Sequence, residues 1–231
     1  MKNNLFAAVA ILSLVTASAQ TTQPTKIKVF TPQASQISKD NSYKWTVKTD
    51  LLGILVGEFP VIAEYRIAPK FSVEASAGVT YAFFPNESLT LTEDDEDIFD
   101  TKAAMGTAFR GTIKYYPSTD YDAIEGWSFG IQLFHKTTNR EYKTSTDSNP
   151  DWDGKKDSKV KTGVSLIISK QIFEDSNISF ESFIGVGFAK TKRTRYFEEY
   201  NTNTETYDIV ENVENKSVPN VQLGFRIGFG N

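Results

Sequence analysis

The sequence predicts an all-β protein, an eight-stranded antiparallel up-and-down transmembrane β-barrel. Apolar and polar residues alternate along several long segments after about residue 45, and long polar links between these segments alternate with short ones. The chain also begins with the pattern of a secretory signal peptide. Because successive side chains of a strand point to opposite faces, the alternation gives each strand one apolar and one polar face.

The first residues predict export from a bacterial cytoplasm. Lys2 gives a positively charged start, Leu5 to Val15 form an apolar run, and Ala17-Ser18-Ala19 matches the small-residue pattern that signal peptidase cleaves. The apolar run is about half as long as the roughly 20 residues of a spanning helix. We therefore expect residues 1–19 to be a cleaved signal peptide, with an N-terminal membrane anchor as the alternative.

Composition limits the chemistry of the remaining chain. Residues 20–44 are rich in Thr, Gln, Ser and Pro and are expected to form a flexible periplasmic leader before a barrel at residues 45–231. The absence of Cys excludes disulfides and thiolate metal sites, and a single His, His135, is too few for a His-based zinc site. A net charge of −4 leaves no basic surplus for binding nucleic acid.

The clearest predicted strand runs from Phe71 to Phe83. Its odd positions are apolar, whereas its even positions are small or polar. It is longer than the usual globular strand of about 5–6 residues and long enough for a tilted crossing of a bilayer, which takes about 9–11. Aromatic residues stand at both ends of its apolar face, where the two interfacial girdles of a membrane barrel would lie.

Seven other segments repeat this design, and their connections fall into two kinds. In chain order the predicted strands are 46–56, 59–67, 71–83, 105–115, 127–133, 160–168, 178–188 and 221–229. The links at one end are 57–59, 84–102, 137–159 and 197–216, and those at the other are 68–70, 116–126 and 170–177. Three long polar links at one end are typical of a barrel with longer outer loops and short periplasmic turns. An even number of strands returns both ends of the barrel to the periplasm.

The polar faces of these strands carry charges of both signs. The interior of an eight-stranded barrel is just wide enough for side chains to fill, and an isolated charge buried there is costly. The sequence therefore predicts a lumen ion-pair network and a plugged interior, formed by Lys48, Asp50, Glu64, Arg66, Glu74, Arg110, Lys114, Glu181 and Arg226. A soluble β-sandwich or lipocalin-like barrel would instead turn the apolar faces inward.

Two segments resemble known outer-membrane proteins. Val221 to Phe229 resembles the closing strand of outer-membrane barrels, although Gly230-Asn231 follow the aromatic that normally ends the assembly signal. Lys48 to Gly53, followed by Phe59-Pro60 and Glu64-Tyr65-Arg66, is similar to the opening hairpin of small barrels of the OmpA-transmembrane and OmpX type, especially the Bacteroidetes-type variants. The resemblance implies the barrel fold and an outer-membrane location, and no catalytic residues come with it.

Several residues outside the lumen are candidates for sites. The acidic run Glu93 to Asp97 and the EF-hand-like Asn149 to Gly154 could bind a divalent cation, but both are interpreted as solvated loops, and no metal is expected. His135 lacks recognisable catalytic partners, so we expect no enzymatic activity. By parity Lys190 and Lys192 face outward beyond Phe188, where they could contact phosphates of lipopolysaccharide or simply balance acidic loops.

These features predict a non-enzymatic outer-membrane β-barrel with a plugged charged interior, which displays long outer loops for envelope integrity or surface interaction. Two alternatives stay open: a narrow, porin-like solute channel and a soluble periplasmic lipocalin-like binding barrel. The expected partners are outer-membrane lipid, lipopolysaccharide and the barrel assembly machinery. We expect no cofactor, no nucleic acid and a monomeric state.

Overall fold

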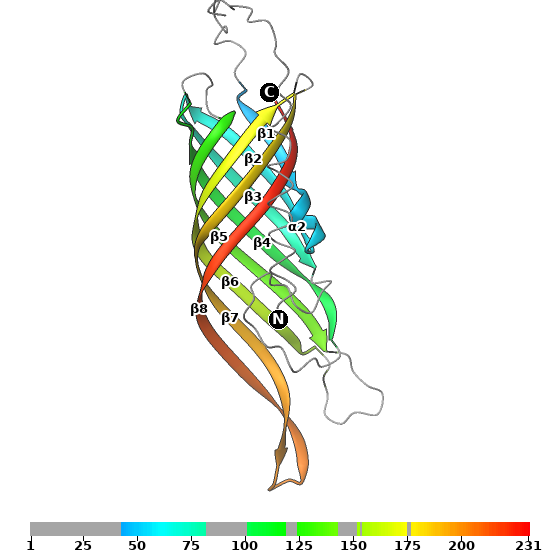
Figure 1. Cartoon of the computed structure of the whole chain (residues 1–231). Helices are drawn as coiled ribbons and strands as arrows, with labels where there is room; N and C mark the ends of the chain where they lie inside the picture. Colours follow the sequence, from blue (N-terminus) through cyan, green and yellow to red (C-terminus); the bar gives the residue numbers. More distant parts are fainter. Residues whose placement is uncertain (1–42, 82–100, 119–123, 143–151, 153, 175–176) are drawn as a thin grey trace, which may run out of the picture. The chain divides into compact units, whose positions relative to one another are not determined.

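The chain forms a closed antiparallel barrel in which each strand pairs with the next and β8 pairs with β1 (Figure 1). The computed structural model describes residues 43–81, 101–118, 124–142, 152, 154–174 and 177–231. The strands are β1 Trp45–Asp50, β2 Glu58–Ala68, β3 Phe71–Tyr81, β4 Thr101–Tyr115, β5 Gly126–Tyr142, β6 Lys156–Phe173, β7 Ile178–Asn201 and β8 Thr206–Gly230. This confirms the predicted all-β, eight-stranded, up-and-down architecture. The predicted signal peptide and nearly all of the predicted leader lie outside the described residues.

The strands are tilted, as closure of a barrel requires. The partners of Val47, followed from strand to strand, lead to Pro219 on β8. Val47 itself, however, pairs with Phe229, ten residues further along the same strand. Such a stagger fixes the inclination of the strands to the barrel axis. We call the end where β1 begins and β8 ends the terminal end, and the opposite end the loop end.

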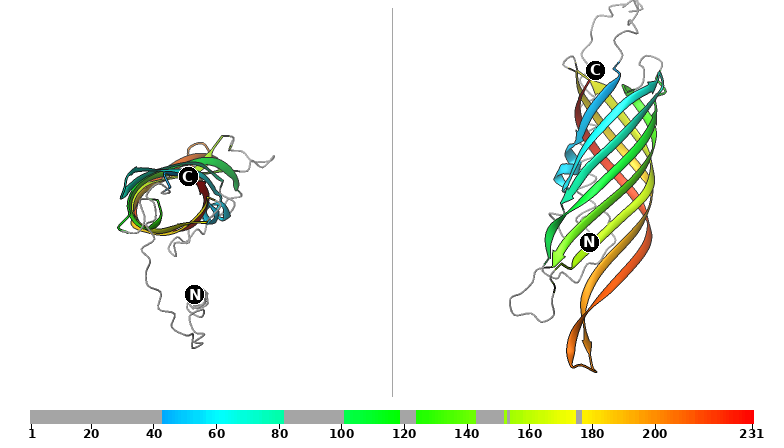
Figure 2. Two further views of the ribbon diagram at one scale, coloured as in Figure 1. Left: turned by 90° about the horizontal axis from the view of Figure 1, so that it is seen from above. Right: turned by 180° about the vertical axis from the view of Figure 1, so that it is seen from behind.

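The predicted strand 46–56 is wrong after Asp50, where the chain turns into the short helix α2, Leu51–Leu55. The Asp50 carboxylate accepts hydrogen bonds from the backbone N–H groups of Leu52 and Gly53, both at 3.1 Å. These two N–H groups would otherwise lack a partner at the start of the helix, and Asp is among the preferred residues for this position. As a result β1 is only six residues long. Viewed from above, α2 lies at the wall of the ring, where it contacts β8 and β2 (Figure 2).

Removal of this cap is expected to destabilise the barrel. Asp50→Ala should lower the free energy of unfolding by about 1 kcal/mol, whereas Asp50→Asn, which keeps a capping oxygen, should lower it less. Both variants remove the negative charge, so the difference between them reports the cap alone. Guanidinium chloride unfolding of the folded protein measures both values, and equal stabilities would contradict the role of Asp50 as a cap.

The prediction of a loop at residues 197–216 is also wrong. β7 and β8 remain paired as far as Asn201 and Thr206, and only residues 202–205 form the turn. β6 leaves β7 at the pair Ser158 and Thr194, so the hairpin continues beyond it as a two-stranded ribbon (Figure 1). The rings of Tyr200 and Tyr207 meet across this ribbon with centroids 5.2 Å apart, a contact that favours strand pairing.

The predicted link 137–159 is also shorter in the structure, because the strands on either side of it are longer than predicted. β5 continues to Tyr142 and β6 begins at Lys156, so the predicted link 137–159 contains less connecting chain than expected. In the predicted link 84–102, residues 84–100 lie outside the described residues, and β4 already includes residues 101 and 102. Alternation extends into both flanks of the β5–β6 connection, but polar side chains on both faces hide it from a search for apolar periodicity.

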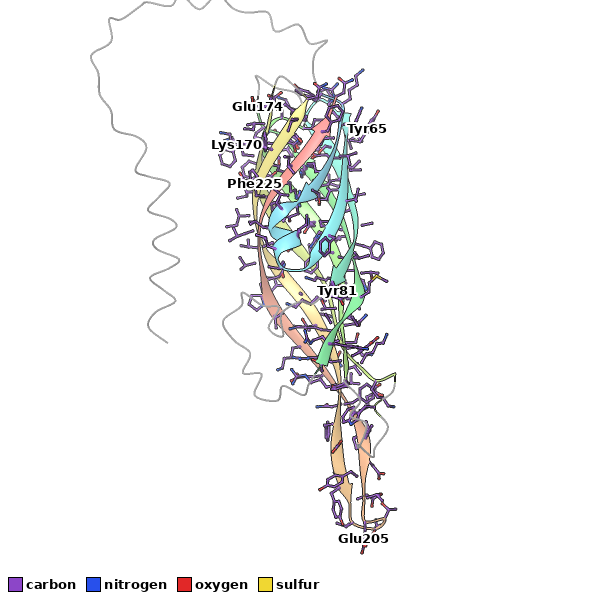
Figure 3. All side chains as sticks on the ribbon, turned by 90° about the vertical axis from the view of Figure 1, so that its right-hand side faces the viewer. Tyr65, Tyr81, Lys170, Glu174, Glu205 and Phe225 are labelled. Carbon is purple, nitrogen blue, oxygen red and sulfur yellow. The ribbon has the colours of Figure 1, made fainter. Side chains whose placement is uncertain are left out.

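The outward face of the barrel is apolar and the inward face is polar. Large apolar side chains are exposed around the ring, including Phe188 at 72%, Met105 at 69% and Leu133 at 64%. Aromatic side chains stand toward the terminal end, where Phe71 lies 5.3 Å from Tyr115 between ring centroids. Figure 3 shows Tyr65 and Phe225 toward that end, Tyr81 further along the barrel, and Glu205 at the tip of the β7–β8 ribbon.

Within the described part of the chain, no helix combines the length and the apolar character needed to cross a membrane.

Candidate functional site

Six charged side chains from six strands meet inside the barrel, and we call them the central ion cluster. Each residue is at most 4% exposed. All six occupy inward-facing positions, because residues of one parity on each strand point to the lumen. The cluster consists of the acids Glu64 on β2, Glu74 on β3 and Glu181 on β7, and the bases Lys48 on β1, Lys114 on β4 and Arg226 on β8.

The two lysines lie among the three carboxylates. The Lys48 ammonium is 2.6 Å from Glu64, 2.6 Å from Glu181 and 3.1 Å from Glu74. The Lys114 ammonium is 2.7 Å from Glu181, 2.8 Å from Glu74 and 3.1 Å from Glu64. Glu64 and Glu74 are direct cross-strand partners, an arrangement that would repel without the cations between them.

Arg226 completes the charge balance. Its Nη1 is 3.0 Å from Glu74 Oε2 and 3.1 Å from Glu181 Oε2. Its guanidinium also lies over the Phe183 ring, 4.1 Å from the centroid. Three carboxylates therefore face three cations, and the formal charge of the cluster is zero. Such balance matters because a buried charge without a partner is strongly destabilising.

Neutral side chains form further hydrogen bonds with the carboxylates and ammonium groups of the cluster. The Tyr116 hydroxyl donates to Glu64 Oε1 at 2.6 Å, and the Ser72 hydroxyl donates to the same oxygen at 2.5 Å. Lys48 donates to Gln171 Oε1 at 3.0 Å. Sequence reasoning missed Tyr116 and Gln171 because it placed both in links. Their positions continue the inward parity of Lys114 and Ser169, which is the signal that could have found them.

Apolar side chains cover the cluster toward the terminal end. Tyr116 and Ile124 are fully buried, and Tyr43 and Phe173 pack against them. The rings of Tyr43 and Phe173 are stacked with centroids 3.6 Å apart. These residues flank strand ends, so they converge where β1, β4 and β6 reach the same end of the barrel. Together with the ion cluster they fill this part of the interior.

A second group of charges lies nearer the loop end. Glu58 at the start of β2 is 4% exposed and forms ion pairs with Arg110 and Lys136, the latter at 3.3 Å. Arg110 was predicted within a single lumen network and instead belongs to this separate group. Glu58 and Lys136 were missed, although the even position of Glu58 on β2 matches that of Glu64.

The other two predicted lumen residues have different places. Asp50 is buried and caps α2, as described above. Arg66 is half-buried on β2, two residues beyond Glu64 toward the terminal end, and is not one of the six residues of the central ion cluster. The predicted set of nine therefore divides into a cluster of six, a second pairing group, a helix cap and a residue near the terminal end.

The central ion cluster contains the only group of carboxylates close enough to hold a metal among the described residues. One oxygen from each of Glu64, Glu74 and Glu181 lies within 4.8 Å of the others. The ammonium groups of Lys48 and Lys114 already stand between these oxygens, so the arrangement suits ion pairing within the protein. The acidic run 93–97 and the acids of the EF-hand-like segment lie outside the described residues.

The remaining candidates lie on the outward surface. His135 is exposed, and its Nδ1 is 2.8 Å from the Thr162 hydroxyl oxygen. Ser145, Asp147 and Asp151, the hydroxyl and acidic residues that follow it in the chain, lie outside the described residues. Lys190 and Lys192 are exposed on β7 and point away from the lumen, in keeping with their parity.

No protein-family model, no curated protein and no solved structure matches this chain. The resemblance to small outer-membrane barrels therefore stays a prediction from the opening and closing segments.

Proposed function

We propose that this chain is a non-enzymatic outer-membrane β-barrel with a plugged charged interior, which presents its loop end for envelope integrity or surface interaction. The observation that carries the proposal is the direction of the side chains. Large apolar residues face outward around the barrel, whereas the central ion cluster is buried within it. A soluble barrel in water would have the opposite distribution, because burial of apolar surface drives its folding.

The outward surface has the properties that a bilayer requires. Val61, Ile131 and Leu166 are each at least 58% exposed although they lie on three different strands. Soluble monomers rarely expose contiguous apolar patches larger than a few hundred Å². The ring closes through the β1–β8 pairs from Thr46–Gly230 to Asp50–Arg226, and beyond them α2 lies against β8. Most strand edges are therefore paired, as hydrocarbon requires. These features favour insertion in lipid over the soluble binding barrel.

The filled interior favours a plug over a solute channel. The cluster side chains reach across the lumen from β1, β2, β3, β4, β7 and β8, and the second charged group follows toward the loop end. Thr112 and Gln132 add a hydrogen bond of 3.2 Å between inward faces of β4 and β5. Eight strands leave space for side chains and little else.

Electrical recordings test the plug. The protein reconstituted in planar bilayers should carry no steady current under conditions in which a 16-stranded porin gives open-channel steps. Membrane fractionation and heat-modifiable gel migration of the same preparation establish whether the barrel folds and inserts. Stable single-channel steps would favour the channel alternative, and recovery of the folded protein in the soluble fraction would favour the binding barrel.

The part best placed for surface interaction is the β7–β8 ribbon. It continues past the last pair with β6 and ends at the turn 202–205 (Figure 3). The aromatic residues Tyr142 and Trp152 lie at its base with ring centroids 4.8 Å apart, and Trp152 Nε1 donates to Glu198 at 3.1 Å. These contacts attach the base of the ribbon to the end of β5 and fix where the ribbon leaves the barrel.

A further inference from the structure

A hollow of about 530 Å³ lies on the outward face of β6, β7 and β8, toward the loop end, and we call it the basic groove. Its outward-facing polar residues are Thr162, Lys190, Lys192, Asn215 and Ser217. Two of these side chains are cationic, two are hydroxyls and one is an amide. No carboxylate lines the groove.

Strand register places the donors of the groove side by side. Lys190 pairs with Thr162 on one side and Ser217 on the other. Lys192 is flanked by Asn215 on β8. Neighbouring strands are about 4.8 Å apart, and residues two apart on one strand share a face. The ammonium groups of both lysines can therefore approach one anion together with the hydroxyl and amide donors.

The positive charge of the groove is not fully balanced by the protein. Lys216, which also borders the hollow, is the strand partner of the buried Thr191 and forms an ion pair with Glu214 at 2.8 Å. Among the residues that the structure describes, no carboxylate forms an ion pair with Lys190 or Lys192. Two exposed cations on adjacent outward positions repel each other unless an anion lies between them.

The groove lies where the apolar outward face ends. Along β7 the outward positions are Ile184, Val186 and Phe188, and Lys190 and Lys192 follow directly. Phe188 is 72% exposed and would contact hydrocarbon. If the barrel is inserted as proposed above, the two lysines lie at the level of lipid headgroups on the loop-end side of the membrane.

We propose that the basic groove binds a phosphate group of lipopolysaccharide in the outer leaflet. Lys190 and Lys192 provide charge-assisted hydrogen bonds to the phosphate oxygens, and Thr162, Asn215 and Ser217 donate further hydrogen bonds. The acyl chains of the same lipid lie against Phe188 and the apolar residues beyond it. This inference rests on the proposed insertion in an outer membrane and adds a specific lipid site to it.

The test compares lipopolysaccharide binding by the wild-type protein and by the double variant Lys190→Gln/Lys192→Gln. Both are folded in neutral detergent and titrated with the phosphorylated lipid moiety of lipopolysaccharide, and native mass spectrometry counts the bound lipids. The double variant should bind at least about tenfold more weakly. The matched control is Lys44→Gln/Lys170→Gln, which removes two exposed lysines at the terminal end and should bind like the wild type.

Further arms identify the ligand. Lipid stripped of its phosphates should bind the wild type as weakly as the phosphorylated lipid binds the double variant. Inorganic phosphate in millimolar excess should not displace the phosphorylated lipid; displacement would show a free-phosphate site and overturn the proposal. Equal lipid affinity of wild type and double variant, with heat-modifiable migration intact, would also overturn it while leaving the proposed function standing. Failure of the wild type to insert in membranes would overturn both.

Discussion

Glu181→Gln is expected to lower the free energy of unfolding of the barrel by about 3–5 kcal/mol. Glu181 contacts all three cations of the central ion cluster, Lys48 at 2.6 Å, Lys114 at 2.7 Å and Arg226 at 3.1 Å. The substitution keeps the size of the side chain but leaves three buried cations facing two carboxylates. The cluster residues are at most 4% exposed, so bulk solvent cannot stabilise the excess charge.

Two further variants make this expectation specific to charge balance. Lys48→Met added to Glu181→Gln restores equal numbers of acids and bases and should recover part of the lost stability. Glu141→Gln, on surface ion pairs with Lys102 and Lys156 near the loop end, should have no measurable effect. Guanidinium chloride unfolding in lipid vesicles measures all three variants. A double variant no more stable than Glu181→Gln would contradict a role for neutrality within the cluster.

With the barrel inserted in a membrane as proposed, Ile131→Arg is expected to destabilise it by about 2–4 kcal/mol. Ile131 is 58% exposed on the outward face of β5 and pairs with Ile113 and Leu166, both of which are exposed and apolar. An arginine in the middle of this face would bring its charge into hydrocarbon, where no protein group can pair with it. In a soluble protein the same substitution at an exposed position would have little effect.

A second arginine variant, placed outside the apolar face, is the control for this prediction. Thr204→Arg, at the exposed turn of the β7–β8 ribbon, adds the same charge outside the apolar face and should cost nothing measurable. Unfolding of both variants is followed in vesicles by the fluorescence of the three tryptophans. Equal stability of Ile131→Arg and wild type in vesicles would mean that the apolar outward face does not contact lipid.

The sequence alone was sufficient for the number, order and orientation of the strands. Alternation in Phe71 to Tyr81 assigns an apolar and a polar face, and the structure exposes the first and buries most of the second. The parity rule therefore also places Glu64, Glu74 and Glu181 in the lumen, because a shift by one residue would put each charge in the outward face. Face assignment is a local property, so a local pattern is enough to predict it.

Boundaries were less predictable because they depend on contacts that alternation does not report. The strand at β1 ends at Asp50 because a carboxylate caps α2, although the apolar residues after it suit a strand equally well. The β7–β8 ribbon carries polar residues on both faces, so its sequence is similar to that of a loop. Its cross-strand pairs, such as Tyr200 with Tyr207, form only when the two strands are already aligned.

Which charges pair was decided by the tertiary structure. Arg110 and Lys114 share the inward face of β4, yet Lys114 joins the central ion cluster and Arg110 pairs with Glu58. The sequence by itself determined that both side chains point into the barrel. Closure of the ring with its ten-residue stagger then set the height of every strand along the axis, and height determines which opposite charges come within reach.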